Sequence, residues 1–266
     1  MTYQPSFMNQ VTHGLPLVRF ATLVNHPVDC LVTLKREHIH SLKALKGKRI
    51  CYSVTGVSSV MLSTMLKHNG LHLSDIEHIN VHFDLAQALL AGKIDGFTGG
   101  MRNFEPFQLR QVGEKPRLFF PEKNGFPLYD ELIFVTNKKN SRDPRLKAFV
   151  CALRQAVFYL RANPEKTWRI FAKNHPALNN PLNKQAWFAS LPYFDSHPGF
   201  LNKKRYRHFS RFLFAQHVIP TLPPLSDYAV DFSEACGPVG LSSVIPGQEK
   251  GHVITGFAFQ RQARSR

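Results

Sequence analysis

In the first half of the chain, short apolar runs typical of strands alternate with segments whose apolar residues recur at helical spacing. Unbroken apolar runs at 17–24 and 29–34 predict two strands, and Asn25-His26-Pro27 separates them because proline favours an extended or turn conformation in the residue before it. After residue 49, short apolar runs alternate with segments whose apolar residues recur at helical spacing, and glycines close the helical segments. This alternation predicts an α/β fold with right-handed crossovers and mainly parallel sheets.

The stretch 93–105 joins an apolar strand to a polar turn and a helix. The pair Gly99-Gly100 is expected to end the strand. Ligands of open α/β sheets collect at the carboxyl ends of strands, where backbone N–H groups and helix N-termini are free. The polar residues expected at this ligand-binding edge are Thr98, Arg102, Asn103 and Glu105.

The second half of the chain contains one apolar strand, 132–136, and is otherwise helical. The predicted helices are 144–160, 164–173, 182–191 and 203–217. Residues 233–266 are rich in Gly, Ser and Gln, and we expect them to form a flexible tail.

The α/β unit at 37–125 is expected to stand as a separate lobe. Residues 1–36 and 126–232, with the C-terminal helices, would then form the other lobe, which we call lobe 1; the unit at 37–125 is lobe 2. Two chain segments cross between the lobes, which is the arrangement of a hinged clamp. The cleft between such lobes is a favoured place for a small-molecule site.

Length and composition fit an ordinary globular protein. The 266 residues are 43% hydrophobic, which is enough for well-buried cores. No apolar run approaches the roughly 18 residues that span a bilayer, so no direct membrane insertion is expected. The first ten residues lack the basic and apolar regions of a signal peptide, and the chain as written would stay in the cytoplasm.

The formal net charge of +16 is dispersed along the chain. The densest basic block, 203–208, lies within a helical apolar pattern, so it is interpreted as the solvated face of an amphipathic helix. No zinc-finger spacing or aromatic RNA-binding strand accompanies it, and no nucleic-acid partner is predicted. A basic surface-interaction protein remains an alternative that rests on charge alone.

The cysteines and histidines do not form a metal motif. Cys30, Cys51, Cys151 and Cys236 stand far apart, which argues against both a metal site and a disulfide framework and favours small core residues. The 13 histidines form no His-Glu-x-x-His or comparable set. We therefore expect no metal and no cofactor.

Four stretches in order, at 45–54, 102–105, 119–122 and 129–132, resemble a known family, and Arg102-Asn103-Phe104-Glu105 is the most specific of them. The chain resembles the thiamine-precursor branch of periplasmic solute-binding proteins over about 3–232. These are the pyrimidine-binding components of ABC importers, related to sulfonate- and nitrate-binding proteins and to the fungal pyrimidine synthase. The resemblance implies a two-lobed type II periplasmic binding fold, an ABC permease as partner and a periplasmic location.

The same resemblance implies that lobe 1 is incomplete. Family members have an exported N-terminus and a first β-α-β portion, whereas this chain resembles them only from near Tyr3. An N-terminally shortened version is therefore expected, and a degenerate fragment that does not bind remains an alternative.

A methylated aminopyrimidine requires aromatic walls, acceptors for its exocyclic amine, and donors for its ring nitrogens. The residues that the resemblance and these chemical types assign to the ligand site are Tyr3, Gln4, Ser53, Thr55, Gly56, Asn103, Glu105, Tyr129 and Glu131.

Several of these residues also have a purely structural interpretation. Ser53 and Thr55 either contact the ligand or cap the following helix. Glu105 either binds the ligand or complements the helix dipole, and Arg102 would pair with Glu105 or Asp130. Tyr129 and Glu131 flank the second crossing, so they could serve the hinge alone.

An enzyme of the pyrimidine-synthase type is the competing hypothesis. That branch carries a cysteine-rich cluster before the strand that aligns with 132–136, and a reactive His and Lys near the start. Here residues 124–129 contain no cysteine, and Thr2 and Ser6 occupy approximately the reactive positions. The residues that would carry the chemistry are missing, so we predict a binding protein rather than an enzyme.

Overall fold

The computed structural model of this chain describes residues 1–52, 57–80 and 85–237. Its strands are β1 (Leu17–Val24), β2 (Asp29–Leu34), β3 (Arg49–Tyr52), β4 (Glu77–Asn80), β5 (Gly96–Met101), β6 (Pro116–Phe119) and β7 (Leu132–Asn137). Its α-helices are α1 (Gln4–Thr12), α2 (Val57–His68), α3 (Leu85–Leu90), α4 (Glu105–Gln111), α5 (Pro144–Ala162), α6 (Pro164–Asn174), α7 (Pro181–Ser190), α8 (Lys203–Ala215) and α9 (Leu225–Tyr228).

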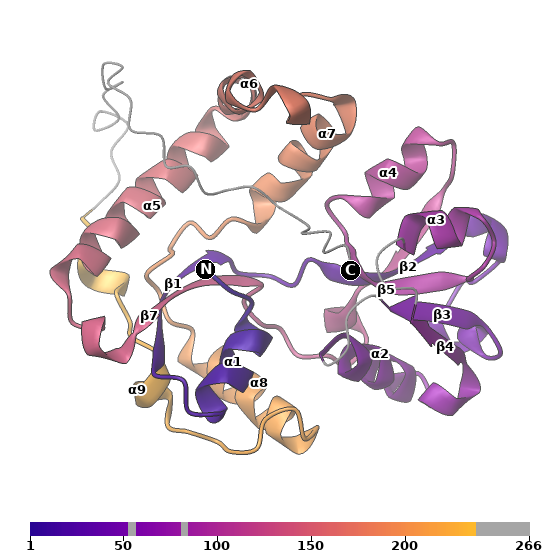
Figure 1. Ribbon diagram of the computed structural model, residues 1–266, viewed down its shortest axis with the longest axis horizontal. Helices are drawn as coiled ribbons and strands as arrows, with labels where there is room; N and C mark the ends of the chain where they lie inside the picture. Colours follow the sequence, from indigo (N-terminus) through magenta and orange to yellow (C-terminus); the bar gives the residue numbers. More distant parts are fainter. Residues whose placement is uncertain (53–56, 81–84, 238–266) are drawn as a thin grey trace, which may run out of the picture.

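Two lobes lie side by side (Figure 1), which agrees with the predicted two-lobed α/β architecture. One lobe holds the five-stranded sheet with order β4-β3-β5-β2-β6. Within that sheet β3 is parallel to β4 and β5, whereas β2 is antiparallel to β5 and β6. The prediction of mainly parallel sheets was therefore wrong, because β2 enters from the other lobe and not through a strand-helix-strand crossover.

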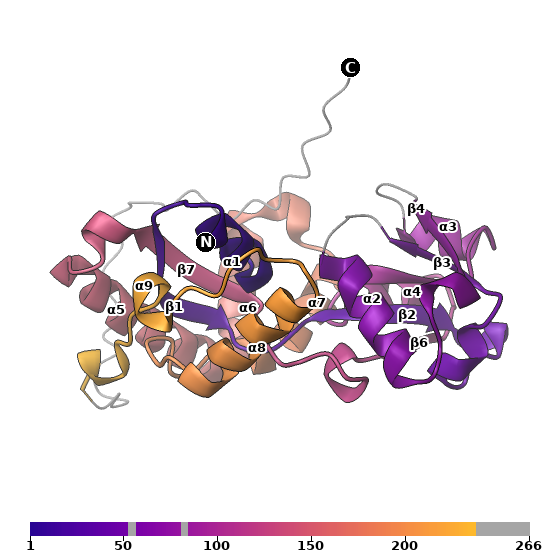
Figure 2. The same cartoon turned by 90° about the horizontal axis from the view of Figure 1, so that it is seen from below.

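Strand β2 belongs to the second lobe. The sequence placed 29–34 in lobe 1, but Asp29 pairs with Met101 of β5, and Leu31 pairs with Phe119 of β6. The first crossing segment is therefore 25–28, directly before β2, and the predicted boundary at residue 36 moves to this point. Figure 2 shows the chain passing from β1 in one lobe to β2 in the other.

Strand β5 continues through the glycine pair that was expected to end it. Gly99 adopts a φ of 87°, in the region that favours glycine, yet the strand runs on to Met101. A Cβ atom at Gly100 would collide with the Phe97 ring, so glycine is required there for packing rather than for termination. The polar turn consequently begins at Arg102.

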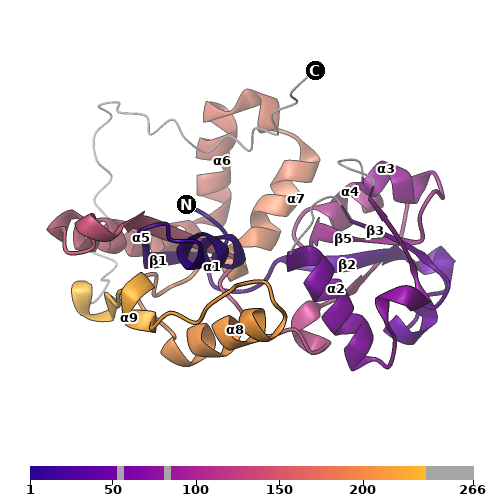
Figure 3. The same cartoon turned by 60° about the horizontal axis from the view of Figure 1, so that its bottom comes forward.

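Lobe 1 is built on the antiparallel pair β1 and β7. Helix α5 packs on this pair through Phe149, whose ring lies 5.6 Å from that of Phe20 and 4.9 Å from that of Phe134. Figure 3 shows α8 on one side of lobe 1 and the α6–α7 hairpin on the opposite side. Helix α1 was not predicted, although Phe7 and Met8 on it are fully buried.

One cluster of buried apolar side chains extends through both lobes. It includes Met61 of α2 in one lobe and Phe209 of α8 in the other. The second crossing segment is the stretch 124–131 before β7. Its residue Phe126 belongs to the same cluster and makes an edge contact with Phe209 at 6.1 Å. The crossing segment is thus packed into a hydrophobic core, which restricts its motion.

A disulfide joins Cys151 of α5 to Cys236, with a Cα–Cα distance of 5.4 Å. The sequence analysis argued against a disulfide because the cysteines stand far apart in the chain. Their separation of 85 residues says nothing about distance in space once the chain returns to α5. Cys30 and Cys51 are buried free thiols, as expected for small core residues.

We expect the double variant C151S/C236S to lower the free energy of unfolding by about 2–4 kcal/mol, because the disulfide closes a long loop in the unfolded chain. Urea unfolding followed by circular dichroism measures this difference. A reducing agent should destabilise the unaltered protein to the level of the double variant and should leave the variant unchanged. Equal stability of the two proteins in oxidising buffer would contradict the expectation.

Candidate functional site

The N-terminal residues reach the second crossing by adding to the edge of β7. The backbone of Thr2 donates to the Ile133 carbonyl at 3.0 Å and accepts from the Ile133 N–H at 2.9 Å. This pairing fixes Tyr3, the N-cap of α1, and Gln4, its first residue. The Gln4 Oε1 atom accepts the Asp130 N–H at 2.6 Å, so Gln4 and the neighbouring Tyr3, which were expected to contribute to the ligand site from lobe 1, lie beside the second crossing segment.

Glu131 connects the two crossing segments. Its Oε2 atom accepts the Val28 N–H at 2.8 Å and the Tyr129 hydroxyl at 2.9 Å. Tyr129 is itself buried, with its ring stacked 5.1 Å from that of Phe209. Burial raises the pKa of the Glu131 carboxyl above its ordinary value. These contacts fit the alternative interpretation, in which Tyr129 and Glu131 serve the hinge.

Asp29 lies next to Glu131, and the sequence analysis missed it. Its Oδ1 atom accepts the Gly99 N–H at 3.0 Å, so it lies at the edge of β5 that was expected to bind ligand. Burial, and then the charge of Glu131, raise the pKa of Asp29 to about 8. The available signal was a carboxylate at the first position of an otherwise apolar strand, directly after a crossing segment.

Tyr3 shares this environment. Burial, followed by the charges of Glu131 and Asp29, raises the pKa of its phenol. The Tyr3 phenol is thus within electrostatic range of two carboxyl groups, while the charge of Glu105 also acts on Asp29. We call Tyr3, Asp29, Glu105 and Glu131 the hinge carboxyl cluster. Such a set provides acceptors for an amine and a flat wall for a ring.

Glu105 and Asn103 make contacts that explain part of their placement. The Glu105 Oε2 atom accepts the Met101 N–H at 2.6 Å at the start of α4, which matches the helix-start interpretation. The Asn103 Nδ2 atom donates to the Ser190 hydroxyl of α7 at 2.7 Å, so this residue joins lobe 2 to the α6–α7 hairpin. The buried Asn103 Oδ1 atom has no hydrogen-bond partner among the described residues.

Two expectations about the ligand-binding edge at the end of β5 were wrong. Arg102 pairs with neither Glu105 nor Asp130; its guanidinium binds Glu122 through two hydrogen bonds of 2.7 and 2.9 Å and lies over the Phe120 ring. Thr98 is fully buried inside the sheet rather than at the edge. Strand β5 runs through the glycine pair to Met101, so Thr98 lies within the strand and the turn begins only at Arg102.

Asp130 faces away from the hinge carboxyl cluster. Its carboxylate accepts the Thr22 hydroxyl at 2.8 Å and pairs with Arg205 at 2.8 Å. The same Arg205 guanidinium donates to the Asn25 carbonyl at 2.6 Å. Thr22 also accepts from Arg19, a fully buried arginine that donates to the Phe200 carbonyl at 2.7 Å. This network holds the lobe 1 ends of both crossing segments.

Three predicted ligand residues, Ser53, Thr55 and Gly56, lie outside the described residues. Within the described ranges, no group of three or more His, Cys, Asp or Glu side chains is placed to hold a metal ion. The helices in that part of the chain are all too short or too polar to cross a membrane.

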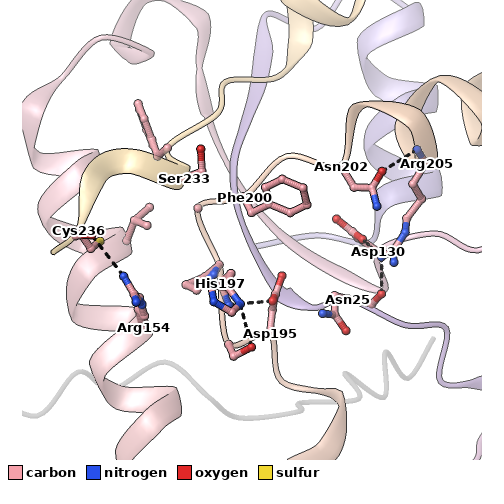
Figure 4. A pocket seen from close by; sticks show the side chains of 15 residues that line it. Asn25, Asp130, Arg154, Asp195, His197, Phe200, Asn202, Arg205, Ser233 and Cys236 are labelled. Carbon is pink, nitrogen blue, oxygen red and sulfur yellow. Dashed lines mark hydrogen bonds and ion pairs between the residues drawn. The ribbon is translucent and has the colours of Figure 1, made fainter. Parts of the chain in front are cut away.

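A separate pocket of about 360 Å³ lies in lobe 1, between α5, the loop around His197 and the segment that ends at Cys236 (Figure 4). Its charged groups already have partners in the protein: Arg205 pairs with Asp130, and the Asp195 carboxylate accepts the His197 N–H at 2.9 Å. None of the predicted ligand residues lines this pocket. The hinge carboxyl cluster is therefore the better candidate site.

Comparison with known proteins places the chain among thiamine-related relatives. The model of the NMT1/THI5-like family matches residues 1–167. A Haemophilus influenzae protein named for thiamine biosynthesis is 42% identical over 232 residues, which cover 87% of this chain and 74% of that protein. The formylaminopyrimidine-binding protein of Halalkalibacterium halodurans is 26% identical over 193 residues, covering 72% of this chain and 58% of its own length.

Enzymes also occur among the relatives. The 4-amino-5-hydroxymethyl-2-methylpyrimidine phosphate synthase of Saccharomyces cerevisiae is 25% identical over 197 residues, 69% of this chain and 57% of the synthase. This chain thus spans somewhat more than half of the binding protein and of the synthase.

Solved structures confirm the periplasmic-binding-protein fold. The alkanesulfonate-binding protein of Xanthomonas axonopodis superimposes with a TM-score of 0.63 at 16% identity, covering 84% of this chain and 77% of that one. The aliphatic sulphonate-binding protein of Escherichia coli gives a TM-score of 0.65 at 13% identity, covering 95% and 79%.

We expect Ser190→Ala to favour separation of the lobes, because it removes the hydrogen bond from Asn103. One hydrogen bond of about 0.5–1.5 kcal/mol corresponds to a roughly two- to tenfold change in the ratio of open to closed molecules. Energy transfer between dyes on the exposed faces of α5 and α2 reports this ratio. Ser141→Ala is the matched control, because that hydroxyl donates to Lys138 within lobe 1. An unchanged ratio in the Ser190 variant would refute the role.

Proposed function

The chain belongs to the NMT1/THI5-like family, and from this premise we propose that it binds a thiamine-precursor aminopyrimidine as the substrate-binding component of an ABC importer. The ligand would lie between the lobes, against the hinge carboxyl cluster. The observation that carries the proposal is the meeting of Glu131, Asp29 and Tyr3 where both crossing segments join.

The chemistry of this cluster suits the proposed ligand. A carboxylate is an acceptor without a competing donor, so Glu131 can receive the exocyclic amine of an aminopyrimidine. The Tyr3 ring supplies an apolar face for the flat heterocycle. The named ligand of the relative from Halalkalibacterium halodurans is a formylaminopyrimidine, which has both features.

Binding would also stabilise the closed clamp. A ligand that contacts residues of both lobes has greater affinity for the closed state and shifts the population towards it. Glu131 comes from the second crossing segment and Asp29 from the first strand of lobe 2. The Asn103–Ser190 hydrogen bond adds a direct protein contact to that closed state.

A synthase activity is the less favoured alternative. The position before β7 that is rich in cysteine in synthases reads Asn124 to Tyr129 here, and Tyr129 is packed on Phe209 inside the core. Thr2, at approximately one of the reactive positions, is engaged through its backbone with β7.

The proposed partner is an ABC permease and the proposed location is the periplasm. Both follow the solved neighbours: the sulphonate-binding protein of Escherichia coli is named as periplasmic, and a Staphylococcus aureus neighbour as the ligand-binding component of an ABC-type import system. The Cys151–Cys236 disulfide independently supports an oxidising compartment, because disulfides of ordinary cytosolic proteins are kept reduced.

We expect calorimetric titration at pH 7 to show one-to-one binding of formylaminopyrimidine or hydroxymethylpyrimidine. Glu131→Gln should weaken binding by roughly 10- to 100-fold, because a hydrogen bond to a charged acceptor contributes about 1.5–3 kcal/mol. Circular dichroism of the variant checks that it remains folded.

Glu77→Gln serves as the control, because Glu77 is exposed at the start of β4 and should leave the affinity unchanged. Failure of the unaltered protein to bind either pyrimidine would overturn the proposal. Turnover of the pyrimidine into a new product would favour the synthase instead.

A further inference from the structure

The two carboxyl groups at the hinge receive different sets of hydrogen-bond donors. Glu131 accepts the N–H groups of Val28 and Asp29 and the Tyr129 hydroxyl. Asp29 accepts the N–H groups of Gly99, at 3.0 Å, and Cys30. Donors stabilise the charged form of a carboxyl, and the additional hydroxyl makes Glu131 the better place for the negative charge.

The groups around Asp29 add more negative charge than positive. Glu131 from the second crossing and Glu105 from α4 both oppose its ionisation, and the Tyr3 phenol and the Cys30 thiol lie in the same region. Arg102 is the cation that acts on this cluster, but its guanidinium is bound by both oxygens of Glu122.

Two interacting carboxyl groups in such a position titrate as a pair. Burial and the Glu131 charge raise the pKa of Asp29 to about 8. The two sets of donors favour a shared proton on Asp29 and the negative charge on Glu131.

A second observation at the same hinge indicates a missing acceptor. Gln4 is fully buried, and its Oε1 atom is fixed by the Asp130 N–H at 2.6 Å. Its Nε2 atom has no hydrogen-bond partner among the described residues. Buried amide donors in proteins are normally paired, so an acceptor supplied by a bound molecule is expected beside the segment that carries Glu131.

We propose that Asp29 is a specificity-determining residue that, as a neutral acid, donates a hydrogen bond to a ring nitrogen of the ligand while Glu131 accepts from the adjacent exocyclic amine. The ligand class is a heteroaromatic ring with an acceptor nitrogen next to an amine, and Gln4 donates to a further acceptor on the same molecule. This assignment rests on the proposed function, and it adds a proton that must be present for the complex to form.

The direction of the pH dependence follows from that proton. Below pH 8 Asp29 already carries it, so the affinity for a neutral aminopyrimidine is nearly constant. Above pH 8 free Asp29 is ionised, and each bound ligand requires one proton from solution, so affinity falls about tenfold per pH unit. Between pH 7 and pH 9.5 the dissociation constant should rise roughly 30-fold.

Calorimetric titration of the full chain with formylaminopyrimidine, from pH 7 to pH 9.5, measures this dependence. At pH 9 two buffers with different heats of ionisation give the number of protons taken up, and we expect about one per ligand. This measurement needs no variant, so it holds even where a substitution disturbs folding.

Asp29→Asn provides the second test, because an amide donates without titrating in this range. The variant should bind within about tenfold of the unaltered protein at pH 7 and should show a flat profile up to pH 9.5. Asp227→Asn is the matched control, because Asp227 is exposed on α9 and the steep profile should persist.

Binding with a flat profile and no proton uptake in the unaltered protein would overturn the role of Asp29 and leave the proposed function standing. A steep profile that persists in Asp29→Asn would also overturn it, because another group would then supply the proton. Absence of binding at every pH would overturn the proposed function and this inference together.

Discussion

The contact on which the rest of the structure depends is the hydrogen bond from the Val28 N–H to the Glu131 carboxylate, which joins the two chain segments that cross between the lobes. A buried carboxylate is costly unless donors surround it, and here the backbone of one crossing and a tyrosine of the other supply them. The two crossings therefore behave as one element. Any rotation of the lobes must preserve this contact or lose the donors that keep Glu131 buried.

Two adjacent residues of the second crossing, Asp130 and Glu131, point to opposite faces of an extended chain and make different contacts. The Asp130 side chain points into lobe 1, where Arg205 and Thr22 hold it, while the Glu131 side chain points towards the first crossing. Side chains alternate in extended backbone, so anchoring and binding can be combined in two consecutive positions. The pocket of lobe 1 lies on the Asp130 side, which explains why it is distinct from the candidate site.

Much of the fold could be predicted from periodicity, because strands and helices with one buried face leave a regular pattern. The long helix from Pro144 was predicted from the spacing of its apolar residues, and the structure shows its N-cap, Asp143, accepting the Arg145 N–H. Helix α1 was missed because two of its four buried positions are Gln4 and Pro5, so Phe7 and Met8 alone do not give a helical repeat of apolar residues. The direction and lobe of β2 could not be predicted, because they depend on its pairing with β5 and β6, far along the chain.

The candidate site was predicted in part for a similar reason. Tyr3, Gln4 and Glu131 were identified from chemical type and family resemblance, and the structure brings them to one hinge. Asp29 was overlooked because its importance comes from the proximity of another carboxyl group, and the local pattern shows only a carboxylate at the start of an apolar strand. The Cys151–Cys236 disulfide encloses α6, α7 and the Ser190 contact within one covalent ring that starts and ends on lobe 1. The segment that touches the opposite lobe thus lies in a loop whose covalent closure depends on the redox conditions around the protein.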